Sequence, residues 1–256
     1  MESPIGGAGR CYYVASCLFT ARFPEVSMRI QAYIRAKGGI ETVRCCIPKY
    51  RVRKYEERLP EGSVRDAWKA LPQSADFQPE DTVFSICPNC INILSEWKKV
   101  GDIRSLWELI DADPDFAYPD YAGMRATLQD CWRTRDRRAE QDAVRSLLRK
   151  MHIDFAETEK NREHADFCGS TLFREQPSKN SKLAPRHYVE QAEGKLLPHT
   201  QEEQLRIMRD YCGQYATETV VCYCHYCLEG LLQGGAGGVH LASLLFPGSG
   251  ENGVRF

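Results

Sequence analysis

The chain has 256 residues, of which 43% are hydrophobic, and its formal net charge is −1 at pH 7. This composition suffices for globular cores, is too polar for a membrane protein, and argues against a nucleic-acid or membrane-surface partner. The opening MESPIGGAGR lacks the apolar core of a signal peptide, and the apolar stretch GVHLASLLF is too short for a membrane helix. We therefore expect a cytoplasmic protein with no membrane insertion.

The first half of the chain alternates predicted strands with predicted helices. Pro24 opens a helical apolar pattern that stops at a Gly-Gly pair. Alternation of this kind predicts a parallel or mixed α/β sheet. The other elements expected here are strands at 12–17, 40–44 and 82–87 and helices at about 63–71 and 90–99.

The same order of elements returns in the second half. IRSLWELI follows Cys90 by about as many residues as HLASLLF follows Cys227. A repeat longer than about a hundred residues indicates a duplicated domain rather than a solenoid. The elements expected in this half are strands at 126–131, 152–158 and 217–222 and helices at 140–153 and 228–232.

We therefore expect an α/β protein of two tandem, pseudo-twofold related modules. The first covers 1–115 and the second covers 116–256, with a linker rich in Asp, Pro and Tyr near 111–122. A polar insertion near 174–198 enlarges the second module. It is expected to be either a docking loop or lid, or ordinary surface disorder.

Twelve cysteines are the exceptional feature of the composition. Cys45 and Cys46 are adjacent, and CxxC pairs begin at Cys87 and Cys224. In a reducing compartment such clusters are typical of metal or redox sites rather than of disulfide frameworks. Isolated cysteines, such as Cys11 and Cys212, are better explained as buried apolar thiols.

The clustered cysteines fall where predicted strands give way to loops. Ligands in open α/β sheets gather outside the carboxyl ends of the strands, and thiolates bind iron well. A CxxC places two sulfurs about one helical turn apart. The helices expected to begin at Cys90 and Cys227 would direct their N-termini toward a negative cluster.

The two sets follow one order, a lone cysteine, then a cysteine pair, then a distant CxxC. This order resembles the cysteine-rich CCG domain, which typifies the B subunit of heterodisulfide reductase and related iron–sulfur oxidoreductase subunits. YYVASCLFTARFP, QDCWRTRDR and DFCG also resemble its local sequences. The first set is Cys17, Cys45, Cys46, Cys87 and Cys90, and the second is Cys131, Cys168, Cys224 and Cys227.

The resemblance implies a different cofactor for each set. Five-cysteine sets in this family hold non-cubane [4Fe–4S] clusters at which disulfides are reduced, so the first set is expected to be catalytic. The second set has Phe167 where a cysteine belongs, and four thiolates suit a cubane [4Fe–4S] cluster, expected to relay electrons. Two alternatives stay open. Cys11 could replace Cys17 as a ligand of the first set, and Cys222 could supply the ligand that the second set lacks because of Phe167.

The sequence has no Gly-rich nucleotide fingerprint, so electrons are expected from an iron–sulfur or flavoprotein subunit in a complex. A small disulfide is the expected substrate, and its identity stays open. Two other classes of protein also stay open. One is an electron-transfer subunit without its own substrate, and the other is a zinc-binding structural protein.

Polar residues beside the second set have two interpretations. The arginines of CWRTRDRR could bind an anionic substrate, but a solvated, salt-bridged helix start is favoured. His225, inside the second CxxC, is expected either to donate a hydrogen bond to sulfur or to lie at the surface. The arginines are Arg133, Arg135, Arg137 and Arg138.

Overall fold

The computed structural model describes residues 9–48, 50, 52–175, 178–192 and 194–248. The chain divides into two compact units, Met1–Ala112 and Asp113–Phe256. The division falls close to the expected boundary at 115 and inside the expected linker. Each unit is described by itself below.

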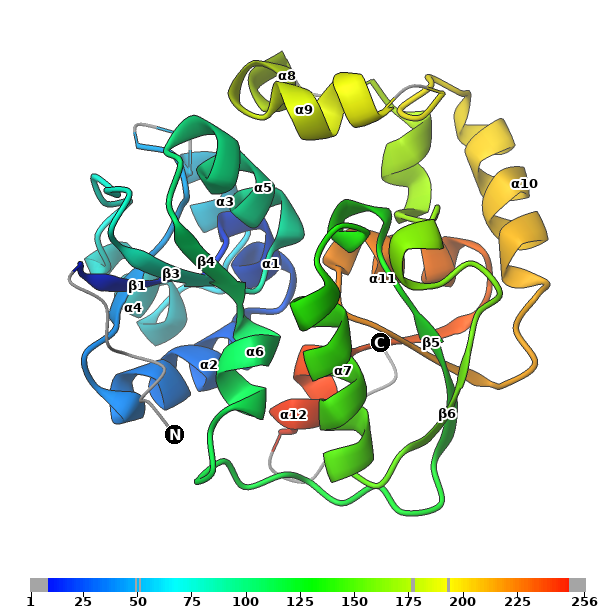
Figure 1. Ribbon diagram of the computed structural model, residues 1–256, viewed down its shortest axis with the longest axis horizontal. Helices are drawn as coiled ribbons and strands as arrows, with labels where there is room; N and C mark the ends of the chain where they lie inside the picture. The colour runs from blue at the N-terminus through cyan, green and yellow to red at the C-terminus, as the bar shows by residue number, and fades with distance from the viewer. Residues whose placement is uncertain (1–8, 49, 51, 176–177, 193, 249–256) are drawn as a thin grey trace. The chain divides into compact units, whose positions relative to one another are not determined.

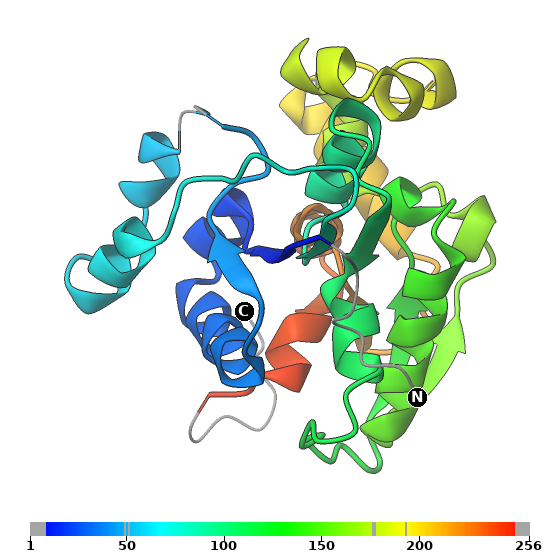
Figure 2. The same ribbon diagram turned by 60° about the vertical axis from the view of Figure 1, so that its left-hand side comes forward.

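The first unit is built on a four-stranded parallel sheet with the order β2-β1-β3-β4. Figures 1 and 2 show helix α2 beside this sheet in blue. The strands are β1 (Cys11–Val14), β2 (Glu41–Val43), β3 (Thr82–Ser85) and β4 (Asp102–Ser105). The helices are α1 (Cys17–Arg22), α2 (Pro24–Lys37), α3 (Arg53–Glu56), α4 (Ser63–Ala70), α5 (Pro88–Trp97) and α6 (Leu106–Asp111).

Local sequence explains why these elements begin and end where they do. Helix α2 has Pro24 in its first turn, buries Ile30 and Ile34, and ends at Gly38, whose φ of 69° suits glycine. Every residue of β3 is buried, as expected for an inner strand covered on both faces. Helix α6 begins with a capping box in which Ser105 and Glu108 bond each other's backbone N–H groups.

The second unit contains a sheet of the same kind, with the order β6-β5-β7-β8 and all strands parallel. Helix α7 packs against β6, and Figure 1 shows both in green. The strands are β5 (Arg125–Gln129), β6 (Asp154–Glu157), β7 (Thr219–Cys222) and β8 (Gly237–His240). The longer helices are α7 (Arg138–Lys150), α10 (Gln201–Cys212) and α11 (His225–Gln233), and a short helix, α12 (Leu241–Leu245), follows β8.

The prediction of two tandem α/β modules is confirmed. Both sheets have equivalent strand orders, and each central strand, β1 or β5, is followed by crossovers to its two neighbours in turn. The fourth strand of each sheet, β4 or β8, was not predicted. These two strands are only four residues long and lie directly before α6 and α12. Strand β4 overlaps IRSLWELI at residues 103–105, whereas β8 overlaps HLASLLF only at His240.

The strand order creates a topological switch point in each sheet. In the first unit the chain moves from β1 to β2 on one side and then crosses to β3 on the other side. The connections after β1 and β3 therefore lead to opposite sides of the sheet, and ligands of open α/β sheets generally bind outside the carboxyl ends of the strands at such a position. In the second unit the equivalent position lies between β5 and β7.

The polar insertion near 174–198 is helical over most of its described part. It contains α8 (Ser178–Leu183), α9 (Pro185–Tyr188) and the 3₁₀ turn η4 (Glu190–Ala192). The side chains of His187 and Tyr188 are buried, so this part is packed rather than disordered at the surface. Residues 176, 177 and 193 of the insertion lie outside the described residues, as do residues 1–8 of the N-terminus.

No helix in the described part of the chain is both long and apolar enough to cross a membrane.

Candidate metal centre

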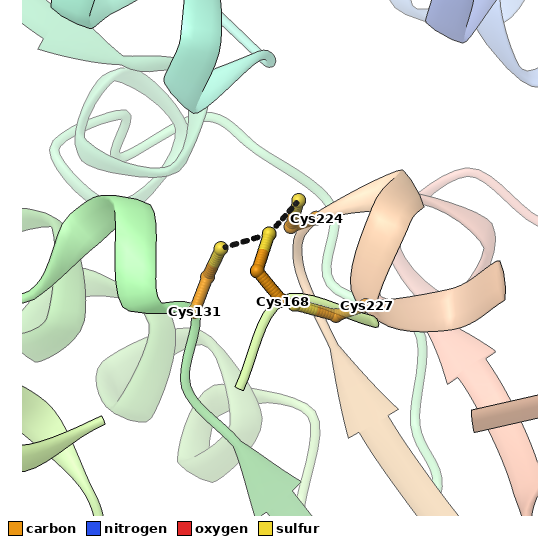
Figure 3. Close-up of side chains that lie close together, drawn as sticks. All are labelled: Cys131, Cys168, Cys224 and Cys227. Carbon is orange, nitrogen blue, oxygen red and sulfur yellow. Dashed lines mark hydrogen bonds between the residues drawn. The ribbon is translucent and has the colours of Figure 1, made fainter. Parts of the chain in front are cut away.

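Four buried cysteines of the second unit bring their sulfur atoms together. All four Sγ atoms lie within 4.8 Å of one another, and each residue is at most 1% exposed. The Sγ of Cys131 lies 3.4 Å from that of Cys168, which lies 4.0 Å from that of Cys224 (Figure 3). The fourth member is Cys227. The four cysteines predicted for this module therefore form one group that could hold a metal.

The fold delivers these thiols from three separate segments. Cys131 follows β5 and precedes the 3₁₀ turn η1 (Trp132–Thr134), while Cys168 precedes the turn η3 (Gly169–Phe173). Cys224 is the N-cap residue of α11, and Cys227 lies in the first turn of the same helix. The site thus lies at the switch point between β5 and β7, beside a helix N-terminus whose N–H groups favour negative charge.

The spacing of the four sulfurs fits a single metal ion. Four thiolates around one tetrahedral zinc ion, with Zn–S bonds of about 2.3 Å, lie roughly 3.8 Å apart. The measured separations of 3.4 and 4.0 Å lie on either side of this value. In a cubane cluster each thiolate binds a different iron, so the sulfurs must lie farther apart than around one ion. A cubane would therefore require these side chains to separate.

Three of these thiols, Cys131, Cys168 and Cys227, have shifted pKa values. Burial raises the pKa of Cys131 and of Cys227 well above the ordinary value. Burial also acts to raise the pKa of Cys168, but hydrogen bonds from the neighbouring thiols and the charge of Arg133 outweigh it, and the pKa falls well below that value. The group therefore prefers a thiolate at Cys168, and a bound metal would have to displace the protons of Cys131 and Cys227.

Arg133 was expected to begin a solvated helix, and that prediction is wrong. Its side chain is 2% exposed, and its guanidinium Nη1 donates hydrogen bonds to the Sγ of Cys168 and, at 3.2 Å, to the Oγ1 of Thr171. The expectation of salt bridges holds for Arg137 and Arg138, which pair with Glu140 and Asp142.

Phe167 occupies the position where the resembled family has a cysteine. Its ring is buried and stacks on Tyr211 with 4.3 Å between ring centroids. Its carbonyl accepts the backbone N–H of Trp132 at 2.9 Å and the thiol of Cys227 at 3.7 Å. The ring therefore fills apolar space, while the backbone still helps to position two segments of the site.

A buried ionic network, which sequence reasoning missed, fixes the residue before Cys131. The carboxylate of Asp130, with an exposed fraction of 0%, accepts hydrogen bonds from Arg145 at 2.6 Å and Tyr223 at 2.6 Å. It also accepts the backbone N–H of Arg162 at 2.8 Å. The available signal was a charged residue between an apolar strand and a cysteine, in LQDC.

The five predicted ligands of the first unit are also buried near the carboxyl edge of their sheet. Cys87 is the N-cap residue of α5, as Cys224 is of α11. Hydrogen bonds join Cys45 to Cys46, Cys46 to Cys90, and Cys90 to Cys87. The fifth thiol, Cys17, begins α1 and interacts electrostatically with Cys46.

This first set is more extended than the second. Among the described residues, only the second set forms a group of metal-binding side chains whose ligand atoms all lie within 4.8 Å of one another. The hydrogen bond with Cys45, together with burial, raises the pKa of Cys46, and the bond with Cys90 likewise raises that of Cys87. The hydrogen bonds and burial therefore favour the protonated thiol at Cys46 and at Cys87.

The remaining cysteines lie apart from these groups. Cys11 starts β1, at the opposite end of the strand from the other cysteines, and burial raises its pKa to about 11. Cys222 ends β7, but its thiol donates to the carbonyl of Cys224 at 3.8 Å rather than joining the sulfur group. Cys212 is buried at the end of α10.

His225, for which a surface position was one expectation, is 2% exposed, and its ring lies 4.3 Å from that of Tyr226.

Comparisons of the chain with protein families, with curated proteins and with solved structures find no match.

Proposed function

We propose that the chain is an iron–sulfur oxidoreductase subunit, similar to the B subunit of heterodisulfide reductase, that reduces a disulfide or a related substrate. The observation that carries this proposal is the gathering of five buried cysteines at the carboxyl edge of the first sheet. The adjacent pair Cys45 and Cys46 is central, because it brings the number of cysteines to five, whereas a single tetrahedral zinc ion binds only four ligands.

The first unit would hold a non-cubane [4Fe–4S] cluster through Cys17, Cys45, Cys46, Cys87 and Cys90. When bound, such a cluster supplies one-electron chemistry beside the substrate. Reduction of a disulfide to two thiols consumes two electrons and two protons. The electrons would come from an iron–sulfur or flavoprotein subunit, and the protons from solvent. The cytoplasm is the proposed setting because it keeps thiols reduced.

Two occupants are proposed for the second unit. The sequence resemblance favours a cubane cluster that relays electrons to the first unit. The short distances between sulfurs favour a second candidate, a single Zn²⁺ that stabilises the fold. Either occupant would be held by Cys131, Cys168, Cys224 and Cys227.

Counting iron, acid-labile sulfide and zinc in anaerobically purified full-length protein tests the proposal. We expect iron and sulfide in the wild-type protein and their loss from the first site in a Cys45→Ser, Cys46→Ser double variant. A Cys224→Ser variant should keep the iron of the first site. If this variant loses only zinc, the second occupant is zinc, whereas loss of iron and sulfide indicates the relay cluster. A colourless wild-type protein that contains only zinc overturns the oxidoreductase proposal.

A further inference from the structure

Arg133 is buried directly against the four-thiol group of the second unit. One nitrogen of its guanidinium, Nη1, contacts both the sulfur of Cys168 and the hydroxyl of Thr171. The Thr171 hydroxyl in turn donates to the carbonyl of Cys168 at 2.7 Å. Cys168 is thereby held at its sulfur by Arg133 and at its backbone by Thr171.

Aromatic rings surround the guanidinium. Its Cζ lies 5.2 Å from the ring centroid of Tyr226, 5.7 Å from that of Tyr188 and 5.9 Å from that of Trp132. The faces of such rings attract a cation, and more strongly where water is excluded. These contacts fix the side chain in place, since Arg133 is 2% exposed.

A four-thiolate metal centre needs positive charge nearby. Four thiolates on a divalent ion leave two excess negative charges, and burial makes such charge costly unless it is compensated. The same excess arises for four thiolates on a cubane core of charge +2. A buried guanidinium that donates to one of the sulfurs offsets part of this charge in either case.

We propose that Arg133 is the built-in counter-ion of this centre and a positioning residue for Cys168. The inference rests on the proposal that the four thiols bind a metal, and it does not depend on which metal that is. It assigns a specific function to one arginine of CWRTRDRR, whereas Arg137 and Arg138 of the same segment form salt bridges with Glu140 and Asp142.

The test measures anaerobic binding of Co²⁺ and Zn²⁺ to reduced, metal-free, full-length protein by competition with a chelator. Mutation of a residue that hydrogen-bonds to a metal ligand generally lowers the metal affinity about 10- to 100-fold. We expect a loss of metal affinity of this size in Arg133→Met. Arg133→Lys keeps the charge but not the planar fork, so it should recover part of the affinity. The matched control is Arg135→Gln, since Arg135 donates instead to Trp132 and Gln191.

The thiolate-to-Co²⁺ absorption band supplies a readout that a purely structural role would not move. A hydrogen bond stabilises the lone pair of the accepting sulfur, so its loss in Arg133→Met should shift the band to longer wavelength, and a weaker bond from the shorter lysine in Arg133→Lys should shift the band less in the same direction. Arg133→Lys keeps this readout available if the Met variant does not fold.

Two outcomes separate this inference from the metal site itself. Unchanged affinity and band position in the Arg133 variants would overturn the counter-ion role while leaving the site intact. Binding by the wild-type protein that equals binding by Cys224→Ser would instead show that the four thiols are not the site, and both proposals for this unit would fall.

Discussion

The backbones of Gly169 and Gly230 touch, so that a methyl group on Gly230 would overlap the Cα of Gly169. The same methyl group would lie 2.9 Å from the sulfur of Met208 and 3.0 Å from the ring of Phe167. Gly169 follows Cys168, a member of the four-thiol group, and Gly230 lies on α11, the helix that carries Cys227. This contact between two glycines therefore sets the distance between two thiol-bearing segments.

Replacing Gly169 with alanine should disrupt the second centre. Gly169 has a φ of 58°, and an added Cβ would overlap the carbonyl oxygen of Tyr226. A left-handed backbone costs alanine about 1–2 kcal/mol, and overpacking typically costs about 1–3 kcal/mol more. Denaturant unfolding and metal titration should show a loss of both stability and metal binding.

Gly235→Ala is the matched control for this change. Gly235 has a φ of 80°, but nothing lies within 4 Å of an added Cβ. The Gly235→Ala variant should lose about 1–2 kcal/mol of its free energy of unfolding because alanine disfavours the left-handed backbone, and it should bind metal normally. Equal metal binding by Gly169→Ala and Gly235→Ala would contradict the proposed role of the glycine contact.

Two neighbouring cysteines should respond differently to replacement by alanine. Cys224 belongs to the sulfur group, whereas Cys222 donates to a backbone carbonyl and lies outside the group. We expect Cys224→Ala to abolish stoichiometric metal binding in the second unit and Cys222→Ala to preserve it. Metal analysis after anaerobic reconstitution measures both, and loss of metal from Cys222→Ala would make Cys222 a ligand.

Arg145 should be among the most sensitive positions of the second unit outside the cysteines. It pairs with the fully buried Asp130 at 2.6 Å and with Glu157 at 2.7 Å. Arg145→Met would leave the Asp130 carboxylate without this partner, and removing one member of a buried pair costs about 3–5 kcal/mol. Chemical unfolding of the reduced protein should show this loss.

Arg138 lies on the same helix and serves as the comparison. Its pair with Asp142 is exposed, so Arg138→Met should cost at most about 1 kcal/mol. Similar losses of stability in the two variants would show that the Asp130 network is not a special support of the Cys131 loop.

Stability should fall in acid partly because of His240. Burial lowers the pKa of His240 to about 3, and its Nδ1 accepts the N–H of Ala242 at the start of α12. The folded chain therefore resists protonation that the unfolded chain accepts near pH 6.5. The contribution of neutral His240 to the free energy of unfolding is therefore fully present above about pH 6.5. Between about pH 6.5 and pH 3 the free energy of unfolding falls by about 1.4 kcal/mol for each unit by which the pH is lowered.

His240→Asn keeps a residue that caps helices well but removes the titrating group. In unfolding of the reduced, metal-free protein, the advantage of wild type over this variant should shrink as the pH falls from about 7 to about 5. Parallel pH profiles for the two proteins would rule out this contribution of His240.

The sequence was sufficient to predict the elements whose local signals agree with their packing. Helix α2 has a proline start, an apolar face and a glycine stop, and it begins and ends close to the expected residues. The predicted strand over 12–17 is shorter in the structure, since Ser16 has a φ of 64° and caps α1. Cys17 therefore lies at the start of a helix rather than at the end of a strand.

Long-range contacts explain most of what the sequence could not indicate. Nothing local distinguishes Arg133 from Arg135, yet one is buried against Cys168 and the other stacks on Trp132. The contact depends on Thr171 and Tyr226, which lie far along the chain. Cysteine spacing correctly grouped the four thiols of the second unit, but distances between the sulfurs were needed to compare a single ion with a cluster.

The most direct test of the oxidoreductase proposal is electron paramagnetic resonance of anaerobically purified protein during a redox titration, with and without a disulfide. We predict an iron-based signal that the disulfide alters and that the Cys45→Ser, Cys46→Ser variant lacks. No iron-based signal at any potential, or a signal that survives unchanged in this variant, would contradict a redox cluster held by the first set of cysteines.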